Sequence, residues 1–224
     1  MTRRALTQEE KRNVTLALVQ ATRKILFTEG IDAVTIRKTA AHAQLNSATI
    51  YKYFSDIEEL ILFTCIDLLR DYAEILSQEL KKKQIEDSKE LYLMIWKVFS
   101  KFSFQHADCL NYLFYGTHRH TLQDVTSYYY ATFHDVLSDL PEKLQDMFRL
   151  GSIKDRNLEL LSLVFDNKLE PKKLAVMGRL TISYYQMMLN EAIKTGKTLD
   201  SNVDDMVEDM LYACEEVLSL ASKK

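Results

Sequence analysis

The sequence has few of the residues that interrupt regular structure. Among its 224 residues, five are glycine and two are proline. Proteins built from many short β-strands use both residues repeatedly in their turns, so this scarcity argues against a sheet architecture. It favours long helices rich in Leu, Ala, Lys and Glu. We therefore expect an all-α fold with a sizeable hydrophobic core.

Cysteines and long apolar runs are also scarce. Cys65, Cys109 and Cys214 are widely spaced and form no CxxC pair, so the sequence predicts neither a disulfide framework nor a zinc finger. The start, "MTRRALTQEEKR", lacks the apolar segment of a signal peptide. The most apolar run, from position 60 to 69, is too short to span a bilayer and contains an aspartate. We expect a cytoplasmic protein with no membrane partner.

Patterns typical of catalysis or metal binding are absent from the sequence. It contains no Gly-rich phosphate loop, no HExxH and no GxSxG. His118 and His120 are two residues apart and would point to different faces of a helix. His106 and Cys109 could share a face, but no further ligand lies at helical spacing from them. We expect no enzyme activity, no catalytic residue, no metal site and no cofactor.

The overall charge of −3 conceals an uneven distribution. Residues 1–55 hold nine Lys and Arg against four Asp and Glu, which gives a charge of +5. The remainder holds 20 against 28, which gives −8. A basic first part predicts a polyanionic partner, although solvated helix faces explain the same excess.

Helical periodicity and capping residues divide the first part into short segments. We expect a first helix after the cap Thr7 that stops at Gly30 and a second after the cap Thr35 that runs to about His42. A third is expected over Ser47 to Phe54 after the cap Asn46, and a long fourth after the cap Asp56 up to Lys83. Residues 1–55 are then a three-helix domain, and residues 56–224 form a larger helical domain.

The second part also reads as helical. The first expected segments run from Asp87 or Ser88 to a break at Gly116, from about Asp124 to near Pro141, and from Pro141 to Gly151. A long helix is expected from Pro171 to about Lys194, with a stop at Gly196. A last helix is expected from Val203 to about Ala221, with Ser201 or Asn202 as its cap. The stretch between positions 152 and 170 has a helical middle whose ends the sequence does not define. Gly178 would allow another backbone to approach closely.

The segment "LNSATIYKYF" has a composition that an ordinary helix does not need. It follows a short helix after the turn "AQLN", the arrangement of a helix-turn-helix, whose second helix enters the major groove of DNA. Small residues at its start, Ser47 and Ala48, would let the backbone approach the bases. Polar groups along it would reach phosphates on either side, namely those of Thr49, Tyr51, Lys52 and Tyr53. The alternative is that its aromatic residues are core and its lysine is merely solvated.

Residues 26–60 read "LFTEGIDAVTIRKTAAHAQLNSATIYKYFSDIEEL" and contain the pattern LF..G....T....A........T.Y.YF...E.L. Through this pattern they resemble the TetR family of bacterial transcriptional regulators. The resemblance implies a dimer that binds palindromic operator DNA, acts as a repressor and is released by a small-molecule effector. It implies that Thr35 contacts a phosphate, that Arg37, Ser47, Ala48 and Thr49 face bases, and that Tyr51, Lys52 and Tyr53 hold the DNA backbone.

Two positions depart from the family pattern. Gln44 stands where the family usually has glycine in the turn, and Ile57 stands where a lysine is common at the start of the fourth helix. The second departure removes one expected phosphate contact. Cations of the amino-terminal segment, Arg3, Arg4 and Lys11, could compensate for it.

The body is expected to hold the effector among aromatic and polar side chains, although aromatic residues at helical spacing are more often core. The candidates are Trp96, Phe99, Phe102, His106, Tyr112, Tyr115, His118, Tyr129, Phe133, Tyr184 and Met188.

The last two helices have wide apolar stripes, which could be ordinary core but also suit a dimeric four-helix bundle. The expected interface residues are Leu174, Met177, Gly178, Thr181, Tyr184, Met188, Val207, Met210, Cys214 and Val217.

An alternative function is a helical small-molecule-binding protein or enzyme in which the first domain is structural and does not regulate DNA.

Overall fold

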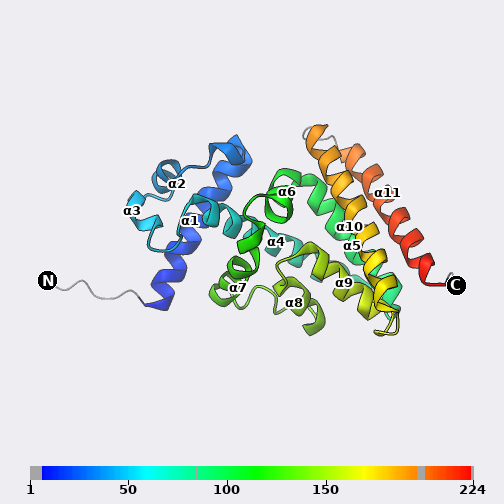
Figure 1. The fold of residues 1–224 in the computed structure, drawn as a ribbon. Coiled ribbons are helices and arrows are strands. Elements are labelled where there is room, and N and C mark those ends of the chain that lie inside the picture. The colour runs from blue at the N-terminus through cyan, green and yellow to red at the C-terminus, as the bar shows by residue number, and fades with distance from the viewer. Residues whose placement is uncertain (1–6, 84, 196–199, 223–224) are drawn as a thin grey trace.

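The computed structural model describes residues 7–83, 85–195 and 200–222, without the side chains of residues 119, 200, 201 and 222. The described residues form helices and connecting turns and no strand, which confirms the all-α fold. Figure 1 shows a small group of helices at the amino-terminal end, joined by one long helix to a larger group in which the last two helices lie side by side.

The first three helices, which we call the head, begin at the predicted caps. They are α1 (Gln8–Glu29), α2 (Ile36–His42) and α3 (Ser47–Ile50), with the 3-10 turn η1 (Ile31–Ala33) after α1. In α1 the Thr7 hydroxyl accepts a hydrogen bond from the Glu10 amide at 3.1 Å, and the Glu10 carboxylate accepts one from the Thr7 amide at 2.7 Å. This capping box confirms the predicted start, and Gly30 ends the helix with φ 89°.

The long helix α4 (Ile57–Lys82) links the head to the body. Its cap is Asp56, whose carboxylate accepts a hydrogen bond from the Glu59 amide at 2.8 Å. α4 packs against α1 of the head and against α5, α6 and α7 of the body. In Figure 1 it runs from beside the head into the middle of the body, so a change in its direction reaches both.

The body contains seven further helices among the described residues. They are α5 (Ser88–Gln105), α6 (Ala107–Tyr115), α7 (Leu122–Thr132), α8 (Glu142–Arg149), α9 (Ile153–Val164), α10 (Pro171–Lys194) and α11 (Asp200–Ser219), with 3-10 turns η2 (Arg119–Thr121) and η3 (Leu220–Ser222). α11 packs on α5 and α10, and α10 packs on α9. The predicted break at Gly116 and the helix from Pro171 to Lys194 are confirmed. The stop predicted at Gly196 lies outside the described residues, as does the side chain of Ser201.

Four helix ends differ from the prediction. The segment expected to run to Gly116 is divided, because α5 ends at Gln105 and α6 begins at Ala107. α3 ends at Ile50, and residues 51–53 continue as turns in which the Lys52 amide bonds to the Thr49 carbonyl, so the predicted helix to Phe54 is too long. α7 ends at Thr132, and turns occupy the stretch up to Pro141 that we had predicted to be helical. α11 begins at Asp200, earlier than predicted. Each difference concerns a helix boundary, where the sequence pattern defines the structure least well.

Gly178 allows a close approach, but its neighbour is a side chain of α9. A Cβ at this position would lie 2.7 Å from Cδ2 of Leu158 and 3.7 Å from Nδ2 of Asn157. The glycine therefore lets α9 pack tightly on α10, and the atoms nearest to it belong to side chains of α9.

None of the described helices combines the length and the apolarity that crossing a bilayer would need.

Candidate nucleic-acid interface and effector cavity

Local hydrogen bonds position the two short helices of the head. The Thr35 hydroxyl accepts from the Lys38 amide at 3.3 Å and caps α2, and the Asn46 side chain accepts from the Ala48 amide at 2.9 Å and caps α3. Between them, the Leu45 amide donates to the Ala40 carbonyl at 2.9 Å. Gln44 in this turn has φ 55°, a left-handed conformation that glycine adopts more readily.

The region from α3 to Phe54 has one buried face and one exposed face. Ile50 is fully buried, and Phe54 is buried against Phe63 of α4, with ring centroids 5.2 Å apart. On the other face Ala48 and Lys52 are exposed, and the Tyr51 side chain is 61% exposed. The aromatic residues therefore do not share one environment: Phe54 is core, whereas Tyr51 projects from the surface.

The remaining predicted DNA contacts differ in how exposed they are. Thr35 and Arg37 are exposed, and Ser47 and Thr49 are half-buried. Tyr53 is also half-buried and packs against the core. Burial raises the pKa of its phenol, and the negative charge of Glu10 adds to this effect. The Tyr53 hydroxyl therefore stays protonated and able to donate a hydrogen bond.

The cations of the head differ in whether a carboxylate already pairs with them. Lys38 forms an ion pair with Glu29. Arg37 and Lys52 are exposed, and neither has an ion pair with any described residue. Arg37 and Lys52 are thus available to an external anion, whereas Lys38 is already neutralised. The predicted compensating residues Arg3 and Arg4 lie outside the described part of the chain, and Lys11 is exposed.

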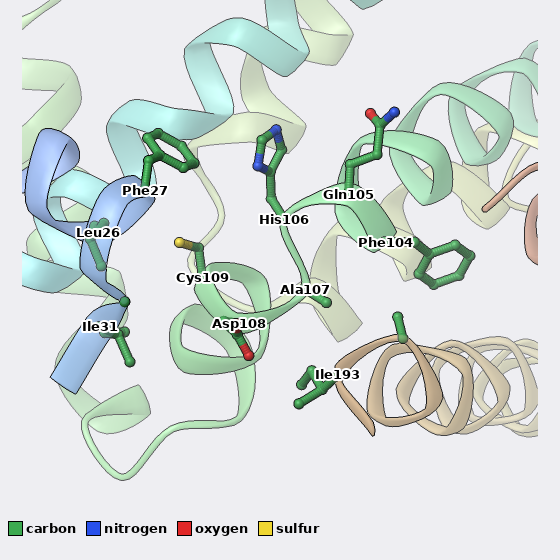
Figure 2. Close-up of a pocket in the computed structure, with 12 residues that line it drawn as sticks. Leu26, Phe27, Ile31, Phe104, Gln105, His106, Ala107, Asp108, Cys109 and Ile193 are labelled. Atoms are coloured by element: carbon green, nitrogen blue, oxygen red, sulfur yellow. The ribbon is translucent and has the colours of Figure 1, made fainter. Parts of the chain in front are cut away.

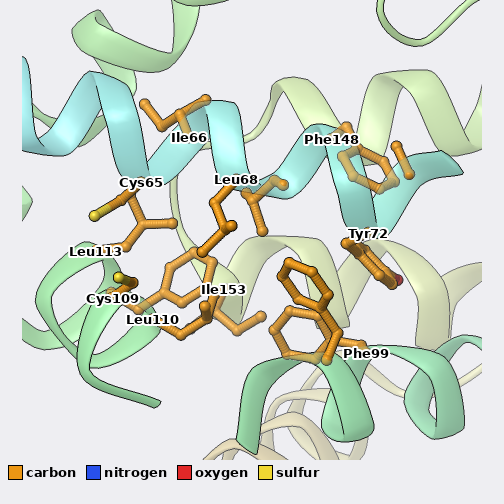
Figure 3. Packing of buried hydrophobic residues seen from close by; sticks show 14 of the residues in the cluster. Cys65, Ile66, Leu68, Tyr72, Phe99, Cys109, Leu110, Leu113, Phe148 and Ile153 are labelled. Carbon is orange, nitrogen blue, oxygen red and sulfur yellow. The ribbon is translucent and has the colours of Figure 1, made fainter. Parts of the chain in front are cut away.

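A small cavity of about 20 Å³ lies in the body between α4, α5, α8 and α9. Figure 3 shows the rings of Tyr72, Phe99 and Phe148 close to one another. Tyr72 stacks on Phe148 at 5.2 Å and meets Phe99 edge to face at 5.3 Å. The cavity is lined by Tyr72, Ile95, Trp96, Phe99, Met147, Ile153, Arg156, Asn157 and Leu160.

Buried polar groups form a hydrogen-bonded cluster beside the cavity. The side-chain oxygen of Asn157 accepts from the Tyr92 hydroxyl at 2.9 Å and from the indole N–H of Trp96 at 3.2 Å. Arg156 donates to the carbonyls of Leu150 at 2.7 Å and Phe148 at 3.0 Å. Sequence reasoning missed Arg156 and Asn157 because they lie in α9, whose ends no sequence signal defined.

The structure brings only part of the predicted effector set to this cavity. Trp96 and Phe99 line it. Phe102, Tyr129, Phe133 and Met188 are core residues elsewhere, and Tyr184 is half-buried on α10. Tyr112 and His118 contact each other at 6.3 Å between ring centroids, and Tyr115 lies 6.4 Å from Tyr185.

His106 lines a different and open depression of about 110 Å³ between the head and the body. Figure 2 shows Phe27 of α1 facing His106 across this depression. Their rings meet edge to face at 5.6 Å, and His106 also contacts Phe102 at 4.7 Å. Burial lowers the pKa of the His106 imidazole, the positive charge of Arg23 lowers it further, and Asp71 partly opposes both.

Most of the side chains predicted for the dimer interface are buried within the protomer. Met177, Gly178, Thr181, Met188, Val207, Met210, Cys214 and Val217 are buried, and Leu174 and Tyr184 are half-buried. The stripes of α10 and α11 face α5, α6 and α9 of the same chain, which already covers their apolar surface. The prediction that the buried side chains form the dimer interface is therefore wrong.

Groups of three or more potential metal ligands do not occur among the described residues. The three cysteines are free thiols, and all are buried.

Comparisons with known proteins agree with this architecture. Residues 18–62 match the model of the bacterial regulatory proteins of the tetR family. The fold is similar to that of a TetR transcriptional regulator from Rhodococcus sp. RHA1, with 13% identity, a TM-score of 0.54 and coverage of 93% of this chain and 97% of that one. It is also similar to Thermus thermophilus FadR, a TetR family transcriptional repressor in complex with lauroyl-CoA, with 16% identity, a TM-score of 0.53 and coverage of 93% of each chain. None of the curated proteins matches the sequence.

Proposed function

We propose that this chain, which has the head and the fold of TetR-family transcriptional regulators, is a ligand-responsive repressor that binds palindromic operator DNA as a homodimer. The observation that carries the proposal is the two-sided region around α3. Ile50 and Phe54 anchor it in the core, which leaves Ala48, Tyr51 and Lys52 on an exposed ridge. A helix that served only to pack the head would not need a lysine and a tyrosine exposed without protein partners.

The chemistry of the ridge suits duplex DNA. Ser47, Ala48 and Thr49 are small enough to let the backbone of α3 approach the base edges in the major groove. Arg37 and Lys52, which no carboxylate of the described residues neutralises, would displace counterions from phosphates. We propose that Thr35, Tyr51 and Tyr53 add hydrogen bonds to the DNA backbone.

A second copy of the chain has a suitable surface on the last two helices. Exposed apolar residues follow one side of α10, namely Val176, Leu180 and Met187. The outer side of α11 carries Tyr212 among exposed carboxylates, which are Asp205, Glu208, Asp209, Glu215 and Glu216. We propose that α10 of each protomer packs on α11 of its partner, because the exposed Arg179 of α10 would then meet these carboxylates.

The effector is proposed to bind in the cavity between α4, α5, α8 and α9. Tyr72 of α4 forms part of its wall, and Phe54 of the head packs on the same helix. A molecule that prefers one direction of α4 would therefore also prefer one spacing of the two heads. Differential affinity of this kind is what release from DNA requires.

The proposal is tested by DNA binding at increasing salt. The purified protein is titrated against the DNA that flanks its own gene, and affinity is expected to fall steeply as salt rises. Lys52→Ala should weaken binding and reduce the slope of log affinity against log salt by about one. The matched control is Lys154→Ala in α9, which removes an exposed lysine from the body and should leave both quantities unchanged. Tyr53→Phe should also weaken binding.

Absent or salt-insensitive binding would contradict the proposal. It would favour the alternative of a helical small-molecule-binding protein or enzyme whose head is structural. An equal effect of the two lysine variants would also contradict it, since only one of them lies on the ridge.

A further inference from the structure

The cavity in the body contains a buried positive charge that no carboxylate balances. Arg156 is 5% exposed and lines the cavity. No described aspartate or glutamate pairs with it, whereas Arg23, a more exposed arginine, contacts both Asp71 and Asp67. Burial lowers the pKa of Arg156, and the groups that partly offset this effect are the phenols of Tyr130 and Tyr72. A buried charge without a counter-ion is costly, and proteins rarely keep one without a reason.

The protein uses part of the donor capacity of Arg156. The guanidinium has five N–H bonds, of which one on Nε and one on Nη2 donate to the carbonyls of Leu150 and Phe148. The guanidinium carbon also lies 5.5 Å from the ring of Phe114 and 5.9 Å from the ring of Phe148. No described group accepts from Nη1. Donors of the guanidinium therefore remain for a bound molecule.

A second donor lies in the cavity wall. Tyr72 is buried, and its hydroxyl makes no hydrogen bond with any described group. The charge of Arg156 acts on it, opposing the rise in the pKa of Tyr72 that burial causes. A hydroxyl and a guanidinium at one apolar site are the donors that a carboxylate accepts from.

We propose that the effector is an organic carboxylate: a molecule with an apolar, partly aromatic body and one carboxylate group that pairs with Arg156 and Tyr72. The inference rests on the proposed function, since it assigns a chemical class to the effector of that same cavity. The rings of Trp96 and Phe99 and the side chains of Ile95 and Leu160 would surround the body of the molecule. The carboxylate would supply the negative charge that the protein lacks at this place.

The cavity has to open for such a molecule to enter. Its volume of about 20 Å³ is enough for about one water molecule, whereas ligand pockets reach several hundred Å³. Met147, a flexible side chain, and Tyr72 of α4 are in the wall and would have to move. Binding of the carboxylate would thus displace α4, which also supports the head.

The test compares acids with their neutral amides on the full-length protein. The probes are phenylacetate with phenylacetamide and hexanoate with hexanamide, which differ within each pair mainly in charge. Trp96 is the one tryptophan of the sequence and lines the cavity, so its fluorescence reports binding there. At least one acid is expected to bind about tenfold or more tightly than its amide, the ratio typical of a hydrogen-bonded charge pair.

Two variants separate ligand binding from the structural role of Arg156. Arg156→Gln should abolish the preference for the acid, with Arg149→Gln on the exposed side of α8 as its control. Because Arg156 also holds two carbonyls, this variant can lose stability. Tyr72→Phe removes a hydroxyl that forms no hydrogen bond with any described group, so this variant should fold normally. It should reduce the affinity for the acid about threefold to tenfold and leave the affinity for the amide unchanged.

Equal affinities of the acids and their amides, or no binding of either acid, would overturn the inference. An acid preference that persists unchanged in Tyr72→Phe and Arg156→Gln would overturn it too. The DNA measurement is independent of these outcomes. A protein that binds operator DNA without preferring acids would contradict only this inference, and one that prefers acids but binds no DNA would contradict only the proposed regulator.

Discussion

Gln44 occupies a backbone conformation that costs free energy for any residue with a side chain. Its φ of 55° lies in the left-handed region, and it sits between the two helices of the candidate DNA-binding motif. We predict that Gln44→Gly raises the free energy of unfolding by about 1 kcal/mol, because glycine adopts this conformation without steric strain. Urea denaturation followed by circular dichroism measures it.

The matched control for this substitution is Gln20→Gly. Gln20 is exposed in the interior of α1, where glycine is unfavourable. This control should lower the free energy of unfolding by about 1 kcal/mol. A loss of stability in Gln44→Gly similar to that of the control would contradict the prediction.

Single residues were predictable from the sequence where their role is local. Thr7, Thr35, Asn46 and Asp56 were all predicted as caps, and each one accepts a hydrogen bond from a backbone amide two or three residues later. Such bonds depend on a few neighbouring residues. The role of Arg156 depends on three helices that meet around it, so no local pattern distinguishes it from a surface arginine.

Among the elements, the junction of α5 and α6 is where protonation of a histidine should change the stability of the fold. His106 ends α5 and lies between Phe27 of the head and Phe102. Because burial and Arg23 lower the pKa of His106 in the folded state, the unfolded chain binds a proton more readily. The contribution of neutral His106 to stability is therefore present above the ordinary histidine pKa of about 6.5 and is lost as pH falls below it.

We predict that His106→Gln reduces the loss of stability between about pH 7 and pH 5. The difference in slope between the two proteins should not exceed about 1.4 kcal/mol per pH unit, the limit for one proton. The measurement is urea denaturation at a series of pH values. Identical pH dependence of the two proteins would contradict the prediction.

Element boundaries were harder to predict than the elements themselves. α10 was predicted at both ends because proline marks its start and the apolar period is strong over its length. α9 was not delimited. It ends in a turn in which Asp166 and Asn167 have φ of 50° and 56°, and these residues are equally common in turns without left-handed geometry. α7 was predicted too long because its apolar residues continue into the turns that follow.

At the scale of the whole molecule, the dimer prediction is the most direct to test. Most of the interface residues predicted from the sequence are buried within the protomer, since a stripe on a helix does not reveal which neighbour covers it. The exposed apolar residues of α10 now define the candidate interface. We predict that Met187→Glu, at a side chain that is 52% exposed, gives a monomer.

Size-exclusion chromatography with light scattering measures the mass of the variant. Gln78→Glu adds the same charge at an exposed position of α4, outside the proposed interface, and should remain dimeric. A dimer for both variants, or a monomer for the unmodified protein, would contradict the proposed interface. The division of the chain into domains at residue 55 stays a prediction, and the contact of Phe54 with Phe63 crosses it.

Because α4 is long, a small tilt at its body end produces a larger displacement at its head end. The helix has 26 residues, and at about 1.5 Å per residue it is about 39 Å long. A tilt of about 5° around its body end would carry its head end sideways by about 3 Å, close to the distance of about 3.4 Å between successive base pairs. Under the proposed mechanism, an effector that tilts α4 by this amount would move the head by about one base-pair step along the double helix.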